Sequence, residues 1–471
     1  MRDVGLAVLV TINLVVLVYF VLLNSVYLFT SMTAFRSLRR YTQRLKSVDV
    51  DEILRSGAAL PVTVVAPAYN EEPTIVEVTQ SLLTLEYPDY QVVIVNDGSK
   101  DRTLELLTET FELVPAPRAP SSDIETAPVR GTYRSTRHPN LLVVDKVNGG
   151  SKADAINAGL NFVRTPLFLI IDSDSLLESQ ALTRVSRPFL EDDRTIAAGG
   201  IVRIVNGSAV RSARVVDVRM PRNLLARFQV LEYLRAFHAG RVGWAALNAT
   251  MIISGAFGLF RRSAVADVGG LNTDAIGEDI DLTIRLHRQC RENGLPYRIV
   301  YIPDPVVWTE GPENLKSLAG QRKRWQRGLI QVLTRNIRML LNPRYGTMGT
   351  LAFPYYFFFE MLGPVVEVAG YAAFAATIIL GLGSAPYILA FLALAIALGV
   401  ALSVAAVGLE ELTFCRYRRT SDLVGLFWLA IIENIGYRQL NSLWRIKGTF
   451  DYFRRAEGWG EMPRKGFATG D

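Results

Sequence analysis

The chain has 471 residues, half of them hydrophobic, and its mean hydropathy is positive. Its formal net charge is +6, which basic residues beside anionic lipid headgroups account for. Nucleic acid is not an expected partner, because the sequence has no basic stripe interleaved with aromatic residues. The two cysteines, Cys290 and Cys415, lie far apart, which argues against a disulfide framework or a Cys-based zinc site.

Two long stretches, residues 4–35 and 368–409, carry no charged side chain. Because ~20 apolar residues suffice to cross a bilayer as a helix, we predict an N-terminal anchor at 1–35. A cleaved signal peptide is the alternative, but the apolar run is too long and its basic residues follow it. The basic linker 36–60 should therefore be cytoplasmic, and we expect a multi-pass protein of the cell membrane.

The C-terminal part, residues 346–445, is predicted to hold transmembrane and interfacial helices. Residues 386–409 form a clear span, whereas prolines and glutamates interrupt residues 351–383. Residues 422–445 are either re-entrant and interfacial or a further crossing. The basic tail 446–471 is predicted to be cytoplasmic, although one more crossing would place it outside.

Residues 61–315 alternate short apolar runs with helical patterns, which predicts an α/β domain with a mainly parallel sheet. The first four strands are expected at 62–66, 91–95, 141–144 and 167–171. The stretch 113–139 has no clear periodicity and is predicted to be a surface loop. Residues 222–240 are predicted to be amphipathic and to lie on the membrane, as is an interface helix at 316–345.

Acidic and polar residues follow three of these strands: Tyr69 and Glu71, then Asp97, then Asp172 and Asp174. Ligands bind beyond the carboxyl ends of strands in open parallel sheets. Two carboxylates one residue apart suit Mg²⁺ or Mn²⁺, but the same residues are also common in plain turns.

Lys152 lies in a Gly-rich turn that enters a predicted helix, a suitable place for a phosphate or simply a solvated lysine. The glycine spacing matches neither the P-loop nor the dinucleotide-binding pattern. Glu278 and Asp279 begin another predicted helix, where Asp279 is either a general base or a capping carboxylate.

The sequence Gln321-Arg322-Lys323-Arg324-Trp325 begins a basic helix before the C-terminal apolar region. Its arginines can stabilise a leaving diphosphate, and Trp325 offers a flat face for a sugar ring. The simpler interpretation is a basic helix at the membrane interface with an interfacial tryptophan.

Taken in this order, the clusters resemble those of membrane-embedded processive family 2 glycosyltransferases, the group of cellulose, hyaluronan and poly-N-acetylglucosamine synthases. The resemblance implies a GT-A catalytic domain, a UDP-sugar donor, a Mg²⁺ or Mn²⁺ ion, and a growing polysaccharide or lipid-linked acceptor. It also implies roles for the residues. Tyr69, Glu71 and Asp97 would bind the uridine, and Lys152 and Asp172 would bind the diphosphate, with the metal on Asp174. Asp279 and Glu278 would be the catalytic residues, with Asp279 as the base, and Gln321, Arg324 and Trp325 would bind the acceptor and the pyrophosphate.

The resemblance further implies inversion and extrusion of a β-linked polymer across the membrane. Transfer of one sugar to a lipid acceptor is the alternative, and an inactive scaffold is disfavoured because Asp97, Asp172, Asp174 and Asp279 are all present. Gly277 stands where several members have threonine. We do not expect control by a cyclic dinucleotide, because no regulatory domain follows the membrane region. Residues 459–465 resemble a gating segment or form a disordered basic tail.

Overall fold

The structure is a computed structural model that describes residues 2–45, 57, 59–121, 124–211, 214–381, 385–413, 417 and 419–455. The described chain forms two compact units. Residues 38–222 and 245–311 form the unit that carries the predicted catalytic residues, and we call it the catalytic unit; residues 2–37, 223–244 and 312–455 form the helical unit.

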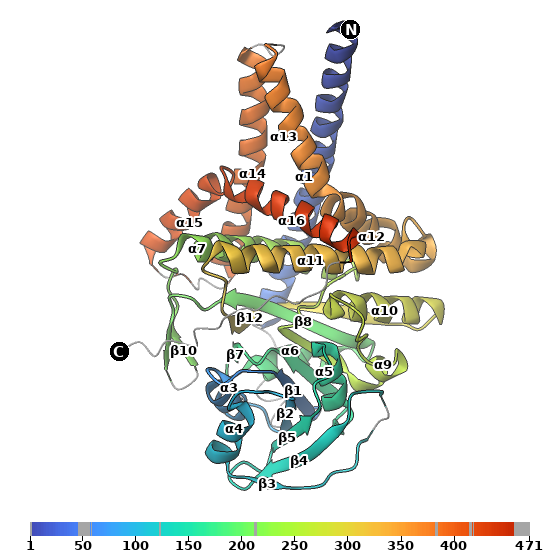
Figure 1. Cartoon of the computed structure of the whole chain (residues 1–471), viewed down its shortest axis with the longest axis vertical. Coiled ribbons are helices and arrows are strands. Elements are labelled where there is room, and N and C mark those ends of the chain that lie inside the picture. The colour runs from blue at the N-terminus through green and yellow to red at the C-terminus, as the bar shows by residue number, and fades with distance from the viewer. Residues whose placement is uncertain are drawn as a thin grey trace. The chain divides into compact units, whose positions relative to one another are not determined.

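A ten-stranded sheet forms the centre of the catalytic unit, in the order β3-β4-β5-β2-β1-β6-β11-β8-β12-β7 (Figure 1). Its strands are β1 (Val62–Ala68), β2 (Tyr90–Asp97), β3 (Leu113–Pro115), β4 (Val129–Ser135), β5 (Leu141–Lys146), β6 (Leu167–Ile171), β7 (Ser175–Leu177), β8 (Thr195–Ile204), β11 (Phe257–Arg261) and β12 (Arg298–Thr309). The strands β9 (Ala209–Arg211) and β10 (Arg214–Asp217) form a separate hairpin. The four neighbours β5, β2, β1 and β6 are parallel and almost entirely buried, and the four predicted strands lie here.

The expectation of a mainly parallel sheet holds for these four strands and for the β8–β12 pair, but the sheet as a whole is mixed. Strand β11 runs antiparallel to both of its neighbours, β6 and β8. On the other side, β4 pairs antiparallel with β5. Only residues 136–140 join these two strands, a connection too short for the crossover that parallel neighbours need.

The predicted surface loop at 113–139 was also wrong in part, because it contains β3 and β4. These strands lie at one edge of the sheet and expose much of their length. Strand β4 pairs with β3 over only three residues and leaves much of its length exposed, so it can be built from polar residues and lacks the apolar run by which the central strands were found.

The helices of the catalytic unit connect and cover these strands. They are α3 (Ile75–Leu83), α4 (Thr103–Phe111), α5 (Lys152–Leu160), α6 (Ala181–Glu191), α9 (Arg262–Asp267) and α10 (Glu278–Glu292). Helix α5 is buried along nearly its whole length and carries Ala153, Ala155, Ala158 and Gly159. These small residues let its backbone lie close to β1 and β2.

The helical unit contains most of α1 (Arg2–Leu45), helices that lie between β10 and β11 in the chain, and helices that follow β12. They are α7 (Leu224–Tyr233), the π-helix η1 (Leu234–Arg241), α8 (Val242–Ala246), α11 (Leu315–Arg335), α12 (Phe353–Tyr355), the π-helix η5 (Tyr356–Met361), α13 (Gly363–Ile379), α14 (Ala385–Thr413), α15 (Thr420–Ile432) and α16 (Tyr437–Phe453), with short turns η2 (Ile337–Met339), η3 (Pro343–Tyr345) and η4 (Met348–Ala352). Helices α1 and α13 lie side by side, and Asn13 Nδ2 donates a hydrogen bond to Thr377 Oγ1 at 3.1 Å (Figure 1).

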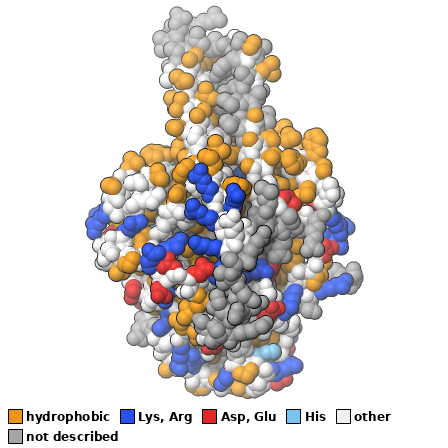
Figure 2. Space-filling view, turned by 180° about the vertical axis from the view of Figure 1, so that it is seen from behind, with side chains coloured by type: hydrophobic (Ala, Val, Ile, Leu, Met, Phe, Trp, Pro, Cys, Tyr) orange, Lys and Arg blue, Asp and Glu red, His pale blue; other side chains and the backbone are white. Residues whose placement is uncertain are grey.

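One helix among the described residues, Leu9–Arg44, is long and apolar enough to cross a membrane. Met348–Met361 and Gly363–Ile379 meet the same test only as a pair bent by 44°. The other apolar stretches found there, Gly399–Leu409 and Thr420–Ile432, are shorter. The described residues thus hold one helix that could span a membrane, or two if the bent pair is one span, and the expected larger multi-pass bundle is not supported. Many hydrophobic side chains of α1 and α13 are exposed, and orange side chains are frequent on the face of this part that Figure 2 shows.

Several expectations fall outside the described residues. They concern residues 46–56 of the predicted linker, the tail from residue 456 onward with its predicted gating segment, and Cys415. Cys290 is described and is a buried free thiol.

The close approach of α5 to the sheet depends on Gly159. A Cβ atom there would lie 2.5 Å from Val65 Cγ1 and 3.0 Å from Val95 Cγ2. We expect Gly159→Ala to destabilise the catalytic unit by about 1–3 kcal/mol through overpacking. Thermal unfolding in detergent would measure this, with Gly425→Ala as the control, because nothing lies within 4 Å of that helical glycine. An unchanged unfolding temperature for Gly159→Ala would contradict the packing argument.

Candidate active site

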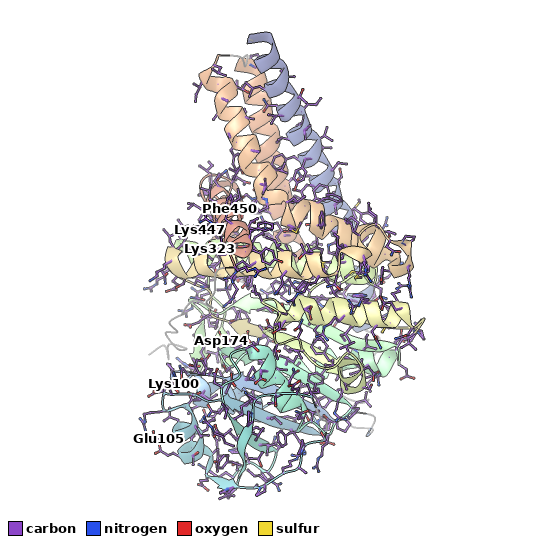
Figure 3. All side chains as sticks on the ribbon, turned by 45° about the vertical axis from the view of Figure 1, so that its right-hand side comes forward. Lys100, Glu105, Asp174, Lys323, Lys447 and Phe450 are labelled. Atoms are coloured by element: carbon purple, nitrogen blue, oxygen red, sulfur yellow. The ribbon has the colours of Figure 1, made fainter. Side chains whose placement is uncertain are left out.

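The parallel strands end together, and this brings their polar residues to one edge of the sheet. In the strand register Ala68 pairs with Asn96, and Asp97 pairs with Lys146. Strand β6 pairs with β1 on the other side and is followed by Asp172 and Asp174. Figure 3 labels Asp174 in this loop.

The loop after β1 contacts the loop after β6. Glu71 is buried, and one of its carboxylate oxygens accepts a hydrogen bond from the Thr74 hydroxyl at 3.0 Å. The same hydroxyl lies 3.4 Å from the backbone oxygen of Ser173. Tyr69 is exposed at the end of β1, so the first predicted cluster offers one aromatic ring to solvent and one buried carboxylate.

Lys152, at the start of α5, joins three parts of this edge. Its ammonium contacts the Asp172 carboxylate and donates to the backbone oxygen of Gly255 at 2.9 Å. Glu278 Oε1 lies 3.8 Å from the same nitrogen. Burial alone would lower the pKa of Lys152, but the charges of Asp172 and Glu278 raise it, so the side chain stays a cation.

Glu278 and Asp279 lie in the first turn of α10, where the helix dipole favours negative charge. Asp279 Oδ2 accepts the N–H of Gly255 at 3.1 Å, and Oδ1 accepts the N–H of Ile280 at 2.8 Å. Burial raises the pKa of Glu278 to about 7, against the opposing effect of Lys152. The two adjacent carboxylates therefore lie in different environments.

A divalent metal fits this edge only if a bound substrate and water supply part of its coordination. Among the described residues no three His, Cys, Asp or Glu side chains gather as a metal site. Mg²⁺, however, commonly binds through one or two carboxylates together with substrate phosphates and water. Asp172 and Asp174 supply two hard oxygen donors of this kind, and Asp172 already neutralises one cation, the Lys152 ammonium.

The structure places the remaining predicted residues on α11, in the helical unit. Gln321 is buried, whereas Trp325 is 45% exposed. Arg322 lies over the Trp325 ring, 4.5 Å from its centroid, and its guanidinium is 2.6 Å from Glu232 Oε2. The catalytic unit thus holds Asp97, Lys152, Asp172, Asp174, Glu278 and Asp279. The helical unit holds Gln321, Arg324 and Trp325.

Sequence reasoning missed two residues of the site. Gly255 contacts both Lys152 and Asp279, and a Cβ atom there would lie 3.1 Å from Lys152 Nζ. Lys146 is fully buried beside Asp97. The Ser254-Gly255-Ala256-Phe257-Gly258 stretch was a usable signal for Gly255, but only the strand register reveals Lys146.

Family models match most of the folded chain. The model described as glycosyl transferase family group 2 matches residues 167–404, about half of the chain. A second, described as glycosyl transferase family 2, matches residues 63–269 and so includes the ends of β1, β2, β5 and β6. The chain belongs to glycosyltransferase family 2.

Two relatives of this glycosyltransferase are poly-beta-1,6-N-acetyl-D-glucosamine synthases. The Staphylococcus aureus protein is 29% identical over 68% of this chain and 64% of its own length. The Staphylococcus epidermidis protein is 29% identical over 57% of this chain and 54% of its own length. The chain therefore spans somewhat under two thirds of the curated relatives that it matches.

Among solved structures, a mannosyltransferase from Pyrobaculum calidifontis, in complex with GDP-Man and Mn²⁺, is similar in fold. It covers 92% of this chain with a TM-score of 0.53 and 20% sequence identity. This likeness supports the GT-A-like mixed α/β fold of the glycosyltransferase.

The raised pKa of Glu278 predicts how stability depends on pH. Between about pH 4.5 and about pH 7 the carboxyl group ionises in the unfolded chain but keeps its proton in the folded one. The free energy of unfolding should therefore fall over this range, by up to about 3 kcal/mol. Glu278→Gln should flatten this slope in unfolding titrations, whereas Glu109→Gln, on the exposed face of α4, should not. Equal slopes for Glu278→Gln and the wild type would contradict the assignment.

Proposed function

We propose that the protein is an inverting glycosyltransferase that polymerises N-acetylglucosamine from a UDP-sugar into a β-linked polysaccharide. The observation that carries the proposal is the group formed by Lys152, Asp172, Glu278 and Asp279 at the carboxyl edge of a family 2 sheet. The names of the staphylococcal relatives support the choice of sugar.

In the proposed reaction an acceptor hydroxyl oxygen attacks the anomeric carbon of the donor sugar. The bond from that carbon to the UDP oxygen breaks, and the electron pair leaves with UDP. Asp279 takes the hydroxyl proton, a role that a carboxylate can fill as the new bond forms. A single displacement of this kind inverts the anomeric carbon, so an α-linked donor gives a β-linked product.

The donor is proposed to bind along the strand ends. Tyr69, Glu71 and Asp97 would bind the uridine, and Lys152 would bind the diphosphate with its cationic side chain. Helix α5 begins at Lys152, so its first N–H groups add to the attraction for phosphate. Asp172 and Asp174 would hold a Mg²⁺ or Mn²⁺ ion, which when bound neutralises charge on the leaving diphosphate.

The helical unit is proposed to bind the acceptor through Gln321, Arg324 and Trp325 and to pass the polymer across the membrane. Polar groups buried among apolar helices support this part of the proposal. Arg235 Nη1 lies 2.5 Å from the fully buried Glu433 and donates to Ser403 Oγ at 2.8 Å. The catalytic unit would be cytoplasmic and α1 would anchor it, because basic residues follow its apolar stretch.

The decisive experiment incubates purified protein with UDP-N-acetylglucosamine and Mg²⁺ or Mn²⁺ and measures both UDP release and product size. We expect a metal-dependent ladder of polymer that a β-1,6-specific hexosaminidase degrades. Asp279→Asn should lower transfer by at least about 10³-fold while UDP affinity changes little, because the proton acceptor is lost but not the nucleotide contacts.

Glu278→Gln is the matched control for this substitution, since it makes the same acid-to-amide change at the adjacent residue. It should retain measurable transfer. Full transfer by Asp279→Asn would contradict the assignment of the base, and a single-sugar glycolipid as the only product would contradict polymerisation.

Trp325 tests the proposed acceptor contact. Trp325→Ala removes an exposed ring, so we expect shorter polymer and a rate at least about tenfold lower, with UDP affinity unchanged. Leu315→Ala is the control, because Leu315 is another exposed apolar residue on α11. Polymer length distributions measured by gel electrophoresis would decide, and wild-type lengths for Trp325→Ala would contradict the role.

A further inference from the structure

A lysine without an assigned role lies in the interior of the catalytic unit. Lys146 is the last residue of β5, and its side chain is completely buried. An ammonium group removed from water costs several kcal/mol unless opposite charges and hydrogen bonds compensate it. A buried lysine at the carboxyl edge of the sheet therefore needs a physical reason.

Two carboxylates and one carbonyl surround the Lys146 ammonium. The nitrogen lies 2.6 Å from Asp97 Oδ1 and 2.5 Å from Asp154 Oδ2. It also donates to the backbone oxygen of Val147 at 2.6 Å. The three charged groups are Asp97, Lys146 and Asp154, and together they carry a net charge of −1.

These contacts fix one oxygen of Asp97 more firmly than the other. Oδ1 accepts from Lys146 and from the N–H of Gly149 at 3.1 Å. Oδ2 has one longer contact, from Asn148 Nδ2 at 3.3 Å. The carboxylate is therefore held in one orientation, with Oδ2 the oxygen that retains capacity to accept a further hydrogen bond.

The other end of the group lies in α5. Asp154 belongs to the first turn of that helix, and its Oδ1 accepts the N–H of Ala127 at 3.0 Å. Lys152 in the same turn contacts Asp172 and Gly255 instead. One helical turn thus connects the Asp97 group with the group proposed to bind the diphosphate.

We propose that Lys146 is a positioning residue that keeps the Asp97 carboxylate ionised and oriented to accept an N–H from the nucleotide base. This assignment rests on the proposed use of a UDP-sugar. An ionised carboxylate accepts from the imide N–H of uracil, whereas cytosine presents an acceptor at the same ring position. Lys146 would therefore determine how well the protein distinguishes uridine from cytidine diphosphates.

Removing the ammonium changes the chemistry of Asp97 in a defined way. In Lys146→Met two carboxylates remain buried without their shared cation, so one is driven to hold a proton. A protonated or turned Asp97 no longer accepts the base N–H. We expect at least about a tenfold loss of UDP affinity in Lys146→Met and a smaller ratio of UDP to CDP affinity, since a hydrogen bond to a charged group is lost.

The test measures UDP and CDP binding to the full-length protein in detergent by calorimetry between about pH 6 and pH 8. Wild-type affinity should vary little, whereas that of Lys146→Met should rise with pH as the remaining proton is lost. The double variant Lys146→Met/Asp154→Asn keeps the net charge at −1 and should recover part of the UDP affinity but not the full UDP-to-CDP ratio.

Val143→Ala is the control for lost stability, because Val143 is a buried apolar residue of the same strand. It should lower the unfolding temperature without changing the UDP-to-CDP ratio. A folded variant without Lys146, single or double, that keeps the wild-type ratio would overturn the assignment. Wild-type protein that binds UDP but transfers no sugar would contradict the proposed function instead, and wild-type protein that binds no UDP would overturn both.

Discussion

Charge compensation by two lysines is the interaction on which the active-site edge depends. The ends of β2, β5 and β6 and the starts of α5 and α10 bring carboxylates together in a partly dry environment. Like charges at such distances raise one another's pKa and oppose folding. Lys146 lies between Asp97 and Asp154, and Lys152 lies between Asp172 and Glu278, so each pair is bridged by one cation.

The two lysines differ in their freedom, and this difference suits different roles. Lys146 is fully buried between Asp97 and Asp154, whereas the side chain of Lys152 is 20% exposed. In the proposed reaction, an incoming diphosphate would offer Lys152 oxygens equivalent to those of the Asp172 carboxylate that it already contacts. That exchange changes partners without leaving the ammonium unpaired. Lys146 has no such exchange available, so its contribution is to hold Asp97 rather than to move.

The sequence predicted the centre of this arrangement because buried parallel strands leave a strong pattern. Strands β1, β2, β5 and β6 are short continuous apolar runs, and polar residues follow them directly. The edge strands β3 and β4 leave no such pattern. The antiparallel direction of β11 was equally hidden, because residue composition does not encode strand direction. Lys146 was missed for a related reason: its importance comes from lying opposite Asp97 in the register, 49 residues away in sequence.

The helix that carries Gln321 and Trp325 is held by polar contacts as specific as those at the sheet edge. Gly448 of α16 lies against α11, where a Cβ atom would come within 2.8 Å of the Lys323 backbone oxygen. Figure 3 shows Lys323 and Lys447 near each other on these two helices. Arg445 of α16 donates to Gln326 Oε1 at 2.9 Å and lies 3.5 Å from Glu360.

These contacts argue against a purely interfacial role for α11. A helix that only rests on lipid headgroups needs a basic face and an apolar face, and neither requires buried partners. Here Arg322 is buried against Glu232, and Gln326 is buried against Met361 and Arg445, while Trp325 between them stays exposed. Because its neighbours are fixed, the exposed Trp325 ring is held in one orientation. Membrane association does not require a fixed ring, whereas recognition of a sugar does.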